Sequence, residues 1–314
     1  MKTRSILSLV GALMMSLGAF AQQDPMYSQY MFNHQVLNPA YAGSWGHFTA
    51  TAIHRMQWVG LNGAPRTSSF SFHTPSSNDR HGFGMGFVND KIGVTTTTGV
   101  NASYAFRIHL GKNARLALGL QGSLDNYRVN FNDVRTGSTI DPSLNPSDPS
   151  FNGNNFSRWF PNAGAGLFFH TKRFFAGASS PRLILHDLND NNPLSLAKMS
   201  RHFFFTTGVV LGREEAAVKF KPSILIKYTP AAPINFDLNA HFLIKDKLWV
   251  GVSYRTEDAI VGMVQLQLLQ FLRMGYAFDY ITSDLNSFGS TSHEFMLGFD
   301  LNFKQRAMVS PRYF

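Results

Sequence analysis

The chain has 314 residues, enough for one large domain or two ordinary ones, and it contains no Cys. We therefore expect no disulfide, no Cys-based zinc site and no lipoprotein anchor. Charged residues make up only 15% and aromatic residues 14%, with 29 Phe, a balance typical of strands that face lipid on one side. The net charge of +9 has no local cluster, which argues against nucleic acid and favours anionic lipid headgroups as the acidic partner.

The amino-terminal region has the pattern of a signal peptide. Lys2 and Arg4 precede an apolar run from Ile6 to Phe20, and Ala19-Phe20-Ala21 follows the small-x-small rule for cleavage. The run is shorter than the roughly 18 residues that a transmembrane helix needs. We expect residues 1–21 to be removed after Ala21 and the mature chain to be exported. Because no later run could span as a helix, a membrane location would require a closed β-barrel.

Apolar and polar residues alternate repeatedly from residue 47 onward. In the clearest case, Phe295, Leu297, Phe299, Leu301 and Phe303 are separated by polar or small residues. Successive side chains of a strand point to opposite faces, so such a segment has one apolar and one polar face. The pattern predicts about fourteen strands, at residues 47–57, 67–75, 81–89, 98–109, 113–126, 160–171, 173–180, 201–213, 216–228, 233–245, 247–256, 259–268, 271–281 and 292–304.

The predicted connections alternate in length. Long connections, near 58–66, 90–97, 127–159, 181–200 and 282–291, follow odd-numbered strands, and every connection after an even-numbered strand is short. Bacterial outer-membrane barrels have short periplasmic turns and long outer loops. A soluble β-sandwich also shows alternation but gives no reason for one-sided loop lengths. We predict an all-β, transmembrane antiparallel up-and-down barrel in the outer membrane, over residues 47–304, with a C-terminal tail at 305–314.

No sequence motif predicts catalysis. Gly84-Met85-Gly86 and Gly164-Ala165-Gly166 lack the Lys and the strand–helix context of a phosphate loop, and small residues at alternate wall positions explain them better. The chain has no Gly-x-Ser-x-Gly elbow. The Pro-rich, Asn-rich stretch 141–155 offers oxygen ligands without calcium-loop spacing, so a solvated loop is favoured. We expect no enzymatic activity, no cofactor and no metal.

The predicted lumen face carries charges of both signs. An open pore and a salt-bridged, plugged interior are both compatible with this mixture, because the sequence does not give the register that pairs the charges. The residues are Lys219, Lys221, Lys227, Arg255, Arg273, Asp125, Asp237, Asp279, Glu294 and Asp300.

Residues 22–46, between the expected cleavage point and the first strand, differ from the rest of the chain. They are rich in aromatic residues and Met, contain two prolines and show no strand alternation. Such side chains would be unfavourably hydrated if they were left free in the periplasm. The segment is predicted to pack inside the barrel's own lumen as a plug, or against a partner as a docking segment, and both roles can hold together.

The same segment, with Asp24 to Tyr30 and Asn38 to Gly43, resembles the PorP/SprF family of the type IX secretion and gliding machinery. The resemblance extends over nearly the whole mature chain, except for the stretch 141–155. Further matching motifs include His54-Arg55, Gln57-Trp58, Gly63-Ala64-Pro65, Ser103-Tyr104-Ala105, Arg201-His202-Phe203-Phe204, Lys227-Tyr228, Ser253-Tyr254-Arg255, Gly275-Tyr276-Ala277-Phe278-Asp279, His293-Glu294 and the closing Ser310-Pro311-Arg312-Tyr313-Phe314.

The resemblance implies a non-enzymatic outer-membrane component of the type IX secretion system, with one of two kinds of partner. One is a peptidoglycan-binding periplasmic protein that links the barrel to the periplasmic ring. The other is the C-terminal domain of a large surface adhesin that is exported or anchored. The partner-binding residues implied by the family signature are Asp24, Pro25, Tyr27, Gln29, Tyr30, Asn38, Pro39, Ala40, Tyr41, Gly43 and Trp58.

The alternative function is an outer-membrane transport barrel of the porin or fatty-acid-transporter type. A continuous polar lumen would favour transport, whereas a lumen filled by residues 22–46 would favour docking. A barrel enzyme, the third class, would need His, Ser and acidic side chains converging at one rim.

Overall fold

The structure, a computed structural model, describes residues 26–111, 113–130, 155–186, 200–230, 232–283, 291–301 and Tyr313. The expected signal peptide, Asp24, Pro25, nearly all of the stretch 141–155 and most of the C-terminal tail therefore lie outside the described residues. No helix in the described ranges is both long enough and apolar enough to cross a membrane.

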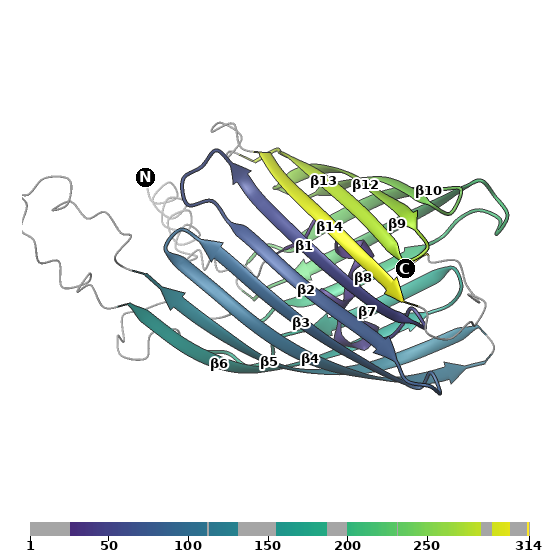
Figure 1. Ribbon diagram of the computed structural model, residues 1–314, viewed down its shortest axis with the longest axis horizontal. Coiled ribbons are helices and arrows are strands. Elements are labelled where there is room, and N and C mark those ends of the chain that lie inside the picture. The colour runs from purple at the N-terminus through teal and green to yellow at the C-terminus, as the bar shows by residue number, and fades with distance from the viewer. Residues whose placement is uncertain are drawn as a thin grey trace, which may run out of the picture.

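Fourteen antiparallel strands close into one barrel, which confirms the predicted fold class (Figure 1). Each strand pairs with its sequence neighbours, and β1 pairs with β14 to close the wall. The strands are β1 (Phe48–Val59), β2 (Arg66–Pro75), β3 (His81–Ile92), β4 (Thr95–Leu110), β5 (Ala114–Val129), β6 (Phe156–His170), β7 (Phe174–Ser180), β8 (Phe203–Val209), β9 (Val218–Tyr228), β10 (Asn235–Ile244), β11 (Leu248–Arg255), β12 (Ala259–Leu269), β13 (Leu272–Ile281) and β14 (Thr291–Leu301).

Each predicted strand coincides with an observed one to within four residues at either end. The prediction extends β8 too far, because residues 210–213 belong to the connection that follows it. Gly212 has a φ of 126°, a backbone conformation that a regular strand does not contain. Beyond Val209, Leu211 makes only an isolated bridge to Phe220.

The two ends of the barrel differ in the lengths of their connections. One end, here named the long-loop mouth, carries the connections after β1, β5, β7 and β13, which span 60–65, 130–155, 181–202 and 282–290. The connection after β3 lies at the same end, but the predicted long connection at 90–97 is wrong: it contains only residues 93 and 94, because β3 and β4 stay paired up to Ile92 and Thr95. The other end, the short-turn mouth, carries turns such as 111–113, 171–173 and 245–247, together with the start of β1 and the end of β14. Outer-membrane barrels place long loops outside the cell and short turns in the periplasm.

The wall is apolar outside and polar inside. In β10, Leu238 is 50% exposed on the outer face, whereas Asp237 and Asn239 are 0% and 5% exposed on the inner face. The same inversion holds in β14, where Phe295 is 50% exposed and Glu294 is fully buried. An exposed apolar face beside a buried charged face suits a wall between lipid and a filled lumen.

Three short 3₁₀ helices lie inside the barrel rather than in its wall (the dark purple segment in Figure 1). They are η1 (Tyr30–Phe32), η2 (His34–Val36) and η3 (Pro39–Tyr41). The residues between Met26 and Gly46 that contain them are here named the lumen segment.

Candidate functional site

The lumen segment buries nearly all of its side chains against the inner wall. Tyr30, Met31, Ala40 and Tyr41 are each 2% exposed or less. A segment without strand alternation coils into short turns instead of pairing, and Pro39 supports η3 because it occupies a position whose N–H needs no helical partner. The Asn38 side chain caps η3 by accepting a hydrogen bond of 2.9 Å from the Ala40 N–H.

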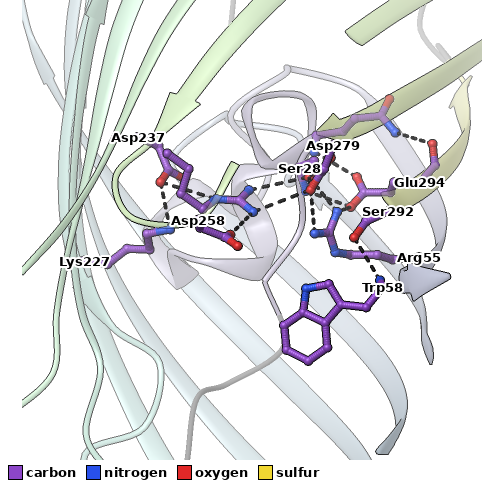
Figure 2. Close-up of polar contacts among 11 residues, drawn as sticks. Ser28, Arg55, Trp58, Lys227, Asp237, Asp258, Asp279, Ser292 and Glu294 are labelled. Atoms are coloured by element: carbon purple, nitrogen blue, oxygen red, sulfur yellow. Dashed lines mark hydrogen bonds and ion pairs between the residues drawn. The ribbon is translucent and has the colours of Figure 1, made fainter. Parts of the chain in front are cut away.

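The first turn of the lumen segment is held by charged side chains from β1, β13 and β14 (Figure 2). The Glu294 carboxylate accepts hydrogen bonds from the main-chain N–H groups of Ser28, at 2.7 Å, and Gln29, at 2.8 Å. The Ser28 hydroxyl donates to Asp279 at 2.8 Å and accepts from the Arg55 Nη1 at 2.6 Å. Arg55 also forms ion pairs with Asp279 at 2.7 Å and Glu294 at 3.3 Å.

The ionic network continues into β9, β10 and β11. Arg255 lies 3.5 Å from Asp237, 2.9 Å from Asp258 and 3.6 Å from Asp279, and Lys227 lies 2.8 Å from Asp237. The mixed charges of this part of the lumen are therefore paired. We name the rim cluster by its members, Arg55, Lys227, Arg255, Asp237, Asp258, Asp279 and Glu294.

The rim cluster lies near the long-loop mouth. Arg255 ends β11, Asp237 is the third residue of β10 and Glu294 is the fourth residue of β14, and all three of these strand ends face that mouth. Buried ion pairs pay a large desolvation cost, so they add little net stability but penalise every arrangement that separates them. The cluster therefore fixes where the start of the lumen segment lies.

On the opposite wall, from β3 to β6, the segment packs directly against glycines. These are here named the glycine seat: Gly82, Gly84, Gly119 and Gly166. A Cβ added to Gly82, Gly119 or Gly166 would come within 3.0 Å of the segment's own atoms, which real side chains do not do. At Gly119 the obstructing atoms belong to the backbone of Pro39 and Ala40, so no rotamer change could relieve the overlap. Glycine is needed at these positions for close approach of two backbones.

The two glycine motifs noted in the sequence belong partly to this seat. An added Cβ at Gly84 would meet the Gln35 side chain, and one at Gly166 would meet the Asn38 side chain. Gly164 faces the Pro181 backbone instead. Small residues at alternate wall positions thus make room for internal segments rather than for phosphate.

At the short-turn mouth, the end of the lumen segment meets a second set of charges. The Arg273 guanidinium lies 4.4 Å from the Trp45 ring centroid and pairs with Asp300 at 2.8 Å. His47 lies 3.5 Å from the same Asp300. Near this mouth the Tyr313 carbonyl accepts a 2.6 Å hydrogen bond from Lys221, a contact that sequence reasoning did not predict.

One cavity lies beside the lumen segment. It has a volume of about 90 Å³ and lies between the segment and the wall from β2 to β5. Its polar lining includes Gln35, Ser71, Asn101, Gln121 and Ser123. A volume of this size holds a few water molecules.

Trp58 lies at a break in the pairing of β1 with β14, where the register shifts between Met56 and Val59. Its φ of 46° is rare for a bulky residue and costs about 1–3 kcal/mol. The main-chain N–H of Trp58 donates to the Ser292 hydroxyl at 3.1 Å (Figure 2), and the Trp58 side chain packs against the hydrophobic cluster that contains Tyr27 and Tyr30.

The described signature residues contact the protein's own wall. Seven of them are buried within the lumen segment: Tyr27, Gln29, Tyr30, Asn38, Pro39, Ala40 and Tyr41. Gly43 lies at the short-turn end, where its carbonyl accepts a hydrogen bond from Arg107, and Trp58 lies on β1 near the other mouth. Their partner-binding role stays a prediction. Sequence reasoning did not bring Arg55, Asp279 and Glu294 together, because their contact depends on register and barrel closure.

Comparison with solved structures shows a general likeness to outer-membrane barrels. The chain is 12% identical to a Pseudomonas aeruginosa FadL homologue, with a TM-score of 0.49 over 90% of this chain and 96% of that one. It is 10% identical to the Acinetobacter baumannii outer membrane protein Omp33, with a TM-score of 0.44 over 81% of this chain and 98% of that one. No curated protein matches the sequence.

The comparison with protein families is more specific than the comparison of structures. The model of the family described as type IX secretion system membrane protein PorP/SprF matches residues 19–299, and its start is consistent with an amino-terminal export signal. This range covers the signature motifs of the lumen segment and all but the last two residues of the barrel wall. The chain therefore belongs to the PorP/SprF family of type IX secretion system membrane proteins.

Proposed function

We propose that the protein is a non-enzymatic outer-membrane component of the type IX secretion system that works by docking a partner, not by conducting solutes. The observation that carries this proposal is the filled lumen. The lumen segment runs from the rim cluster to the charges around Trp45, and one cavity beside it has a volume of about 90 Å³. A porin-type or fatty-acid-transporter-type barrel needs a continuous path through its interior, whereas here the described lumen segment occupies the interior between the two mouths.

We further propose that the partner is the C-terminal domain of a secreted adhesin, a peptidoglycan-binding periplasmic protein, or both. A wall that faces lipid leaves only the two mouths for contact with such proteins. The signature residues, among them Tyr27, Tyr30 and Tyr41, enter this proposal as the residues that keep the lumen segment in place. For these side chains to touch a partner directly, the segment would have to leave the lumen.

Deleting residues 24–43 tests the proposal. We expect the shortened barrel to insert into the outer membrane but to lose display of a reporter fused to a type IX C-terminal domain. The purified shortened barrel is also expected to show a steady conductance in a planar bilayer, whereas the full chain is not. Normal reporter display by the deletion strain would contradict the docking role. Steady conductance of the full chain would favour the transport alternative.

Variants of the outer wall provide a matched control. Val250 and Val252 lie on the exposed apolar face of β11, away from the lumen. Exchanging each of them for Ile keeps the outer face apolar, so reporter display and conductance are expected to stay at the levels of the full chain.

A further inference from the structure

The register of β2 to β5 brings together cations that are scattered along the sequence. Arg66 lies opposite Lys91 in the pairing of β2 with β3. On β4, Thr96 lies opposite Lys91 on one side and Arg128 on the other. The three basic side chains are exposed, and they cross four adjacent strands at the long-loop mouth (Figure 1). We name them the cation row: Arg66, Lys91 and Arg128, with Thr96 between the last two.

The cation row is the last of three bands on the outer face of these strands. The first band is apolar, since Phe70, Phe87 and Leu124 are 45%, 43% and 39% exposed. Two residues closer to the mouth, the register joins a polar band: Ser68, Asn89, Thr98 and Asn126. The cation row follows two residues further on. Such a change from apolar to polar to cationic side chains matches the passage from the hydrocarbon core of a bilayer to its charged surface.

The described part of the chain offers the cation row no counter-charge. Like charges directly opposite each other, as in the pair of Arg66 and Lys91, are destabilising. The acidic residues of β2 to β5, Asp90 and Asp125, are 6% and 2% exposed and lie on the inner face of the wall. An anion from outside the chain would therefore relieve the repulsion within the row.

The other half of the barrel has a different border at the long-loop mouth. β9, β11 and β13 end there in tyrosines that are 41%, 47% and 52% exposed, namely Tyr228, Tyr254 and Tyr280. Aromatic residues of this kind form the girdle of a membrane barrel at the lipid interface. The gathering of cations on β2 to β5 thus indicates a local anion site rather than a feature of the whole rim.

We propose that the cation row binds phosphate groups of a lipid in the outer leaflet of the outer membrane. Arginine binds phosphate through two parallel N–H···O bonds, and lysine binds it as a point charge. Neighbouring strands lie about 4.8 Å apart, so the row spans roughly 14 Å, enough for more than one phosphate. The Thr96 hydroxyl supplies a further donor inside the row. The apolar band directly below the row favours a lipid over free phosphate or an acidic protein.

Binding of lipid A to the purified full chain in detergent, followed by native mass spectrometry, tests the proposal. The probes are diphosphorylated lipid A, dephosphorylated lipid A and inorganic phosphate. The row variant combines Arg66→Gln, Lys91→Gln and Arg128→Gln. The control variant removes the same charge from exposed residues at the short-turn mouth, by Arg80→Gln, Lys172→Gln and Arg173→Gln. Faster migration of unheated than of boiled samples on a gel establishes that each variant is folded.

We expect the control variant to bind diphosphorylated lipid A like the full chain, and the row variant to bind it at least about tenfold more weakly. The reason is that each basic residue lost near a charged lipid surface weakens binding about fivefold. The single variant Lys91→Gln, with an expected loss of about fivefold, serves if the row variant does not fold. A variant that keeps the charges, Arg66→Lys with Arg128→Lys, is expected to retain most of the binding.

Three results would overturn the lipid assignment: equal binding of dephosphorylated lipid A, equal weakening in the control variant, or inorganic phosphate binding as tightly as the lipid. A row variant that binds the lipid normally but loses reporter display would assign the row to an acidic protein instead. Lipid binding and reporter display are separate measurements, so the lipid site can fail while the docking role stands, and the reverse.

Discussion

The two halves of the lumen segment are held by different physical means. The first half, around Ser28 and Gln29, is bound by carboxylates and guanidinium groups from β1, β13 and β14. The second half, around Pro39 and Ala40, rests on wall glycines that allow backbone to approach backbone. Ion pairs are costly to bury, and an arrangement that separates the charges is strongly unfavourable. Close packing, in contrast, depends only on complementary shape. The difference suggests that the rim cluster sets the position of the segment and that the glycine seat supplies contact area.

Removing one partner from the rim cluster should have the largest effect. In a Glu294→Ala chain, Arg55 keeps Asp279 but loses its second carboxylate, and two main-chain N–H groups lose their acceptor. Breaking a buried ion pair typically costs about 3–5 kcal/mol. The expected result is a fall of this size in the free energy of unfolding, measured by urea titration in detergent micelles.

The matched control for that variant is an ion pair in which both side chains reach solvent. Arg115 pairs with Asp79 at 2.8 Å, and their side chains are 34% and 23% exposed. Arg115→Ala should cost about 0–1 kcal/mol, because solvent-exposed pairs contribute little and Asp79 keeps Arg107 at 3.5 Å. Equal losses for the two variants would mean that the rim cluster carries no special weight and that the contrast between the two halves is wrong.

The outer wall provides a test that does not involve the lumen segment. Leu238 lies near the middle of β10 and is 50% exposed on the apolar face. Leu238→Arg should destabilise the barrel by about 2–4 kcal/mol, since a cation near the bilayer midplane loses its hydration. Ile234→Arg, just before β10 begins, should cost about 0–1 kcal/mol at the interface. Refolding into lipid vesicles at several urea concentrations measures both, and a larger cost at Ile234 would contradict the assigned membrane position.

The glycine seat is tested by adding one methyl group. Gly119→Ala would place a Cβ against the backbone of Pro39 and Ala40, so the segment must shift. Overpacking of this kind costs about 1–3 kcal/mol. Gly122→Ala, in the same strand, meets open space and should be neutral. Urea titration is expected to separate the two variants, and a steady conductance in planar bilayers only for Gly119→Ala would show that the segment has been displaced.

The wall could be predicted from the sequence because its signal is local. Alternation such as that of Phe236, Leu238 and Phe242 with the polar residues between them depends only on neighbouring positions, and it located every strand. The rim cluster depends on contacts such as that of Arg55 with Glu294, which are 239 positions apart. Such contacts require the register of β1 against β14, which alternation does not give.

The lumen segment lies between these two cases. Its aromatic and Met content predicted burial, but the composition could not distinguish the barrel's own lumen from a partner protein. The glycine seat could not be predicted from the sequence either. The role of Gly84 and Gly166 depends on which residues of the lumen segment lie opposite them, and this is known only from the structure. Contacts between segments that are distant in the chain cannot be predicted from a single sequence.

The smallest predicted effect concerns a neutral hydrogen bond between the lumen segment and β10. The Asn239 side-chain amide donates to the Tyr30 hydroxyl at 2.7 Å, and both residues are buried. Tyr30→Phe keeps the ring in the hydrophobic cluster but removes the acceptor. Because the Asn239 amide has two further carbonyl acceptors at 3.3 Å, it is not left unsatisfied.

The Tyr30→Phe chain should therefore lose about 1 kcal/mol of its free energy of unfolding, the usual net value of one hydrogen bond. Urea titration should show a small decrease in the urea concentration at the unfolding midpoint, while the slope of the free energy of unfolding against urea concentration stays unchanged. A loss as large as that of Glu294→Ala would mean that this neutral contact, and not charge, positions the first half of the segment.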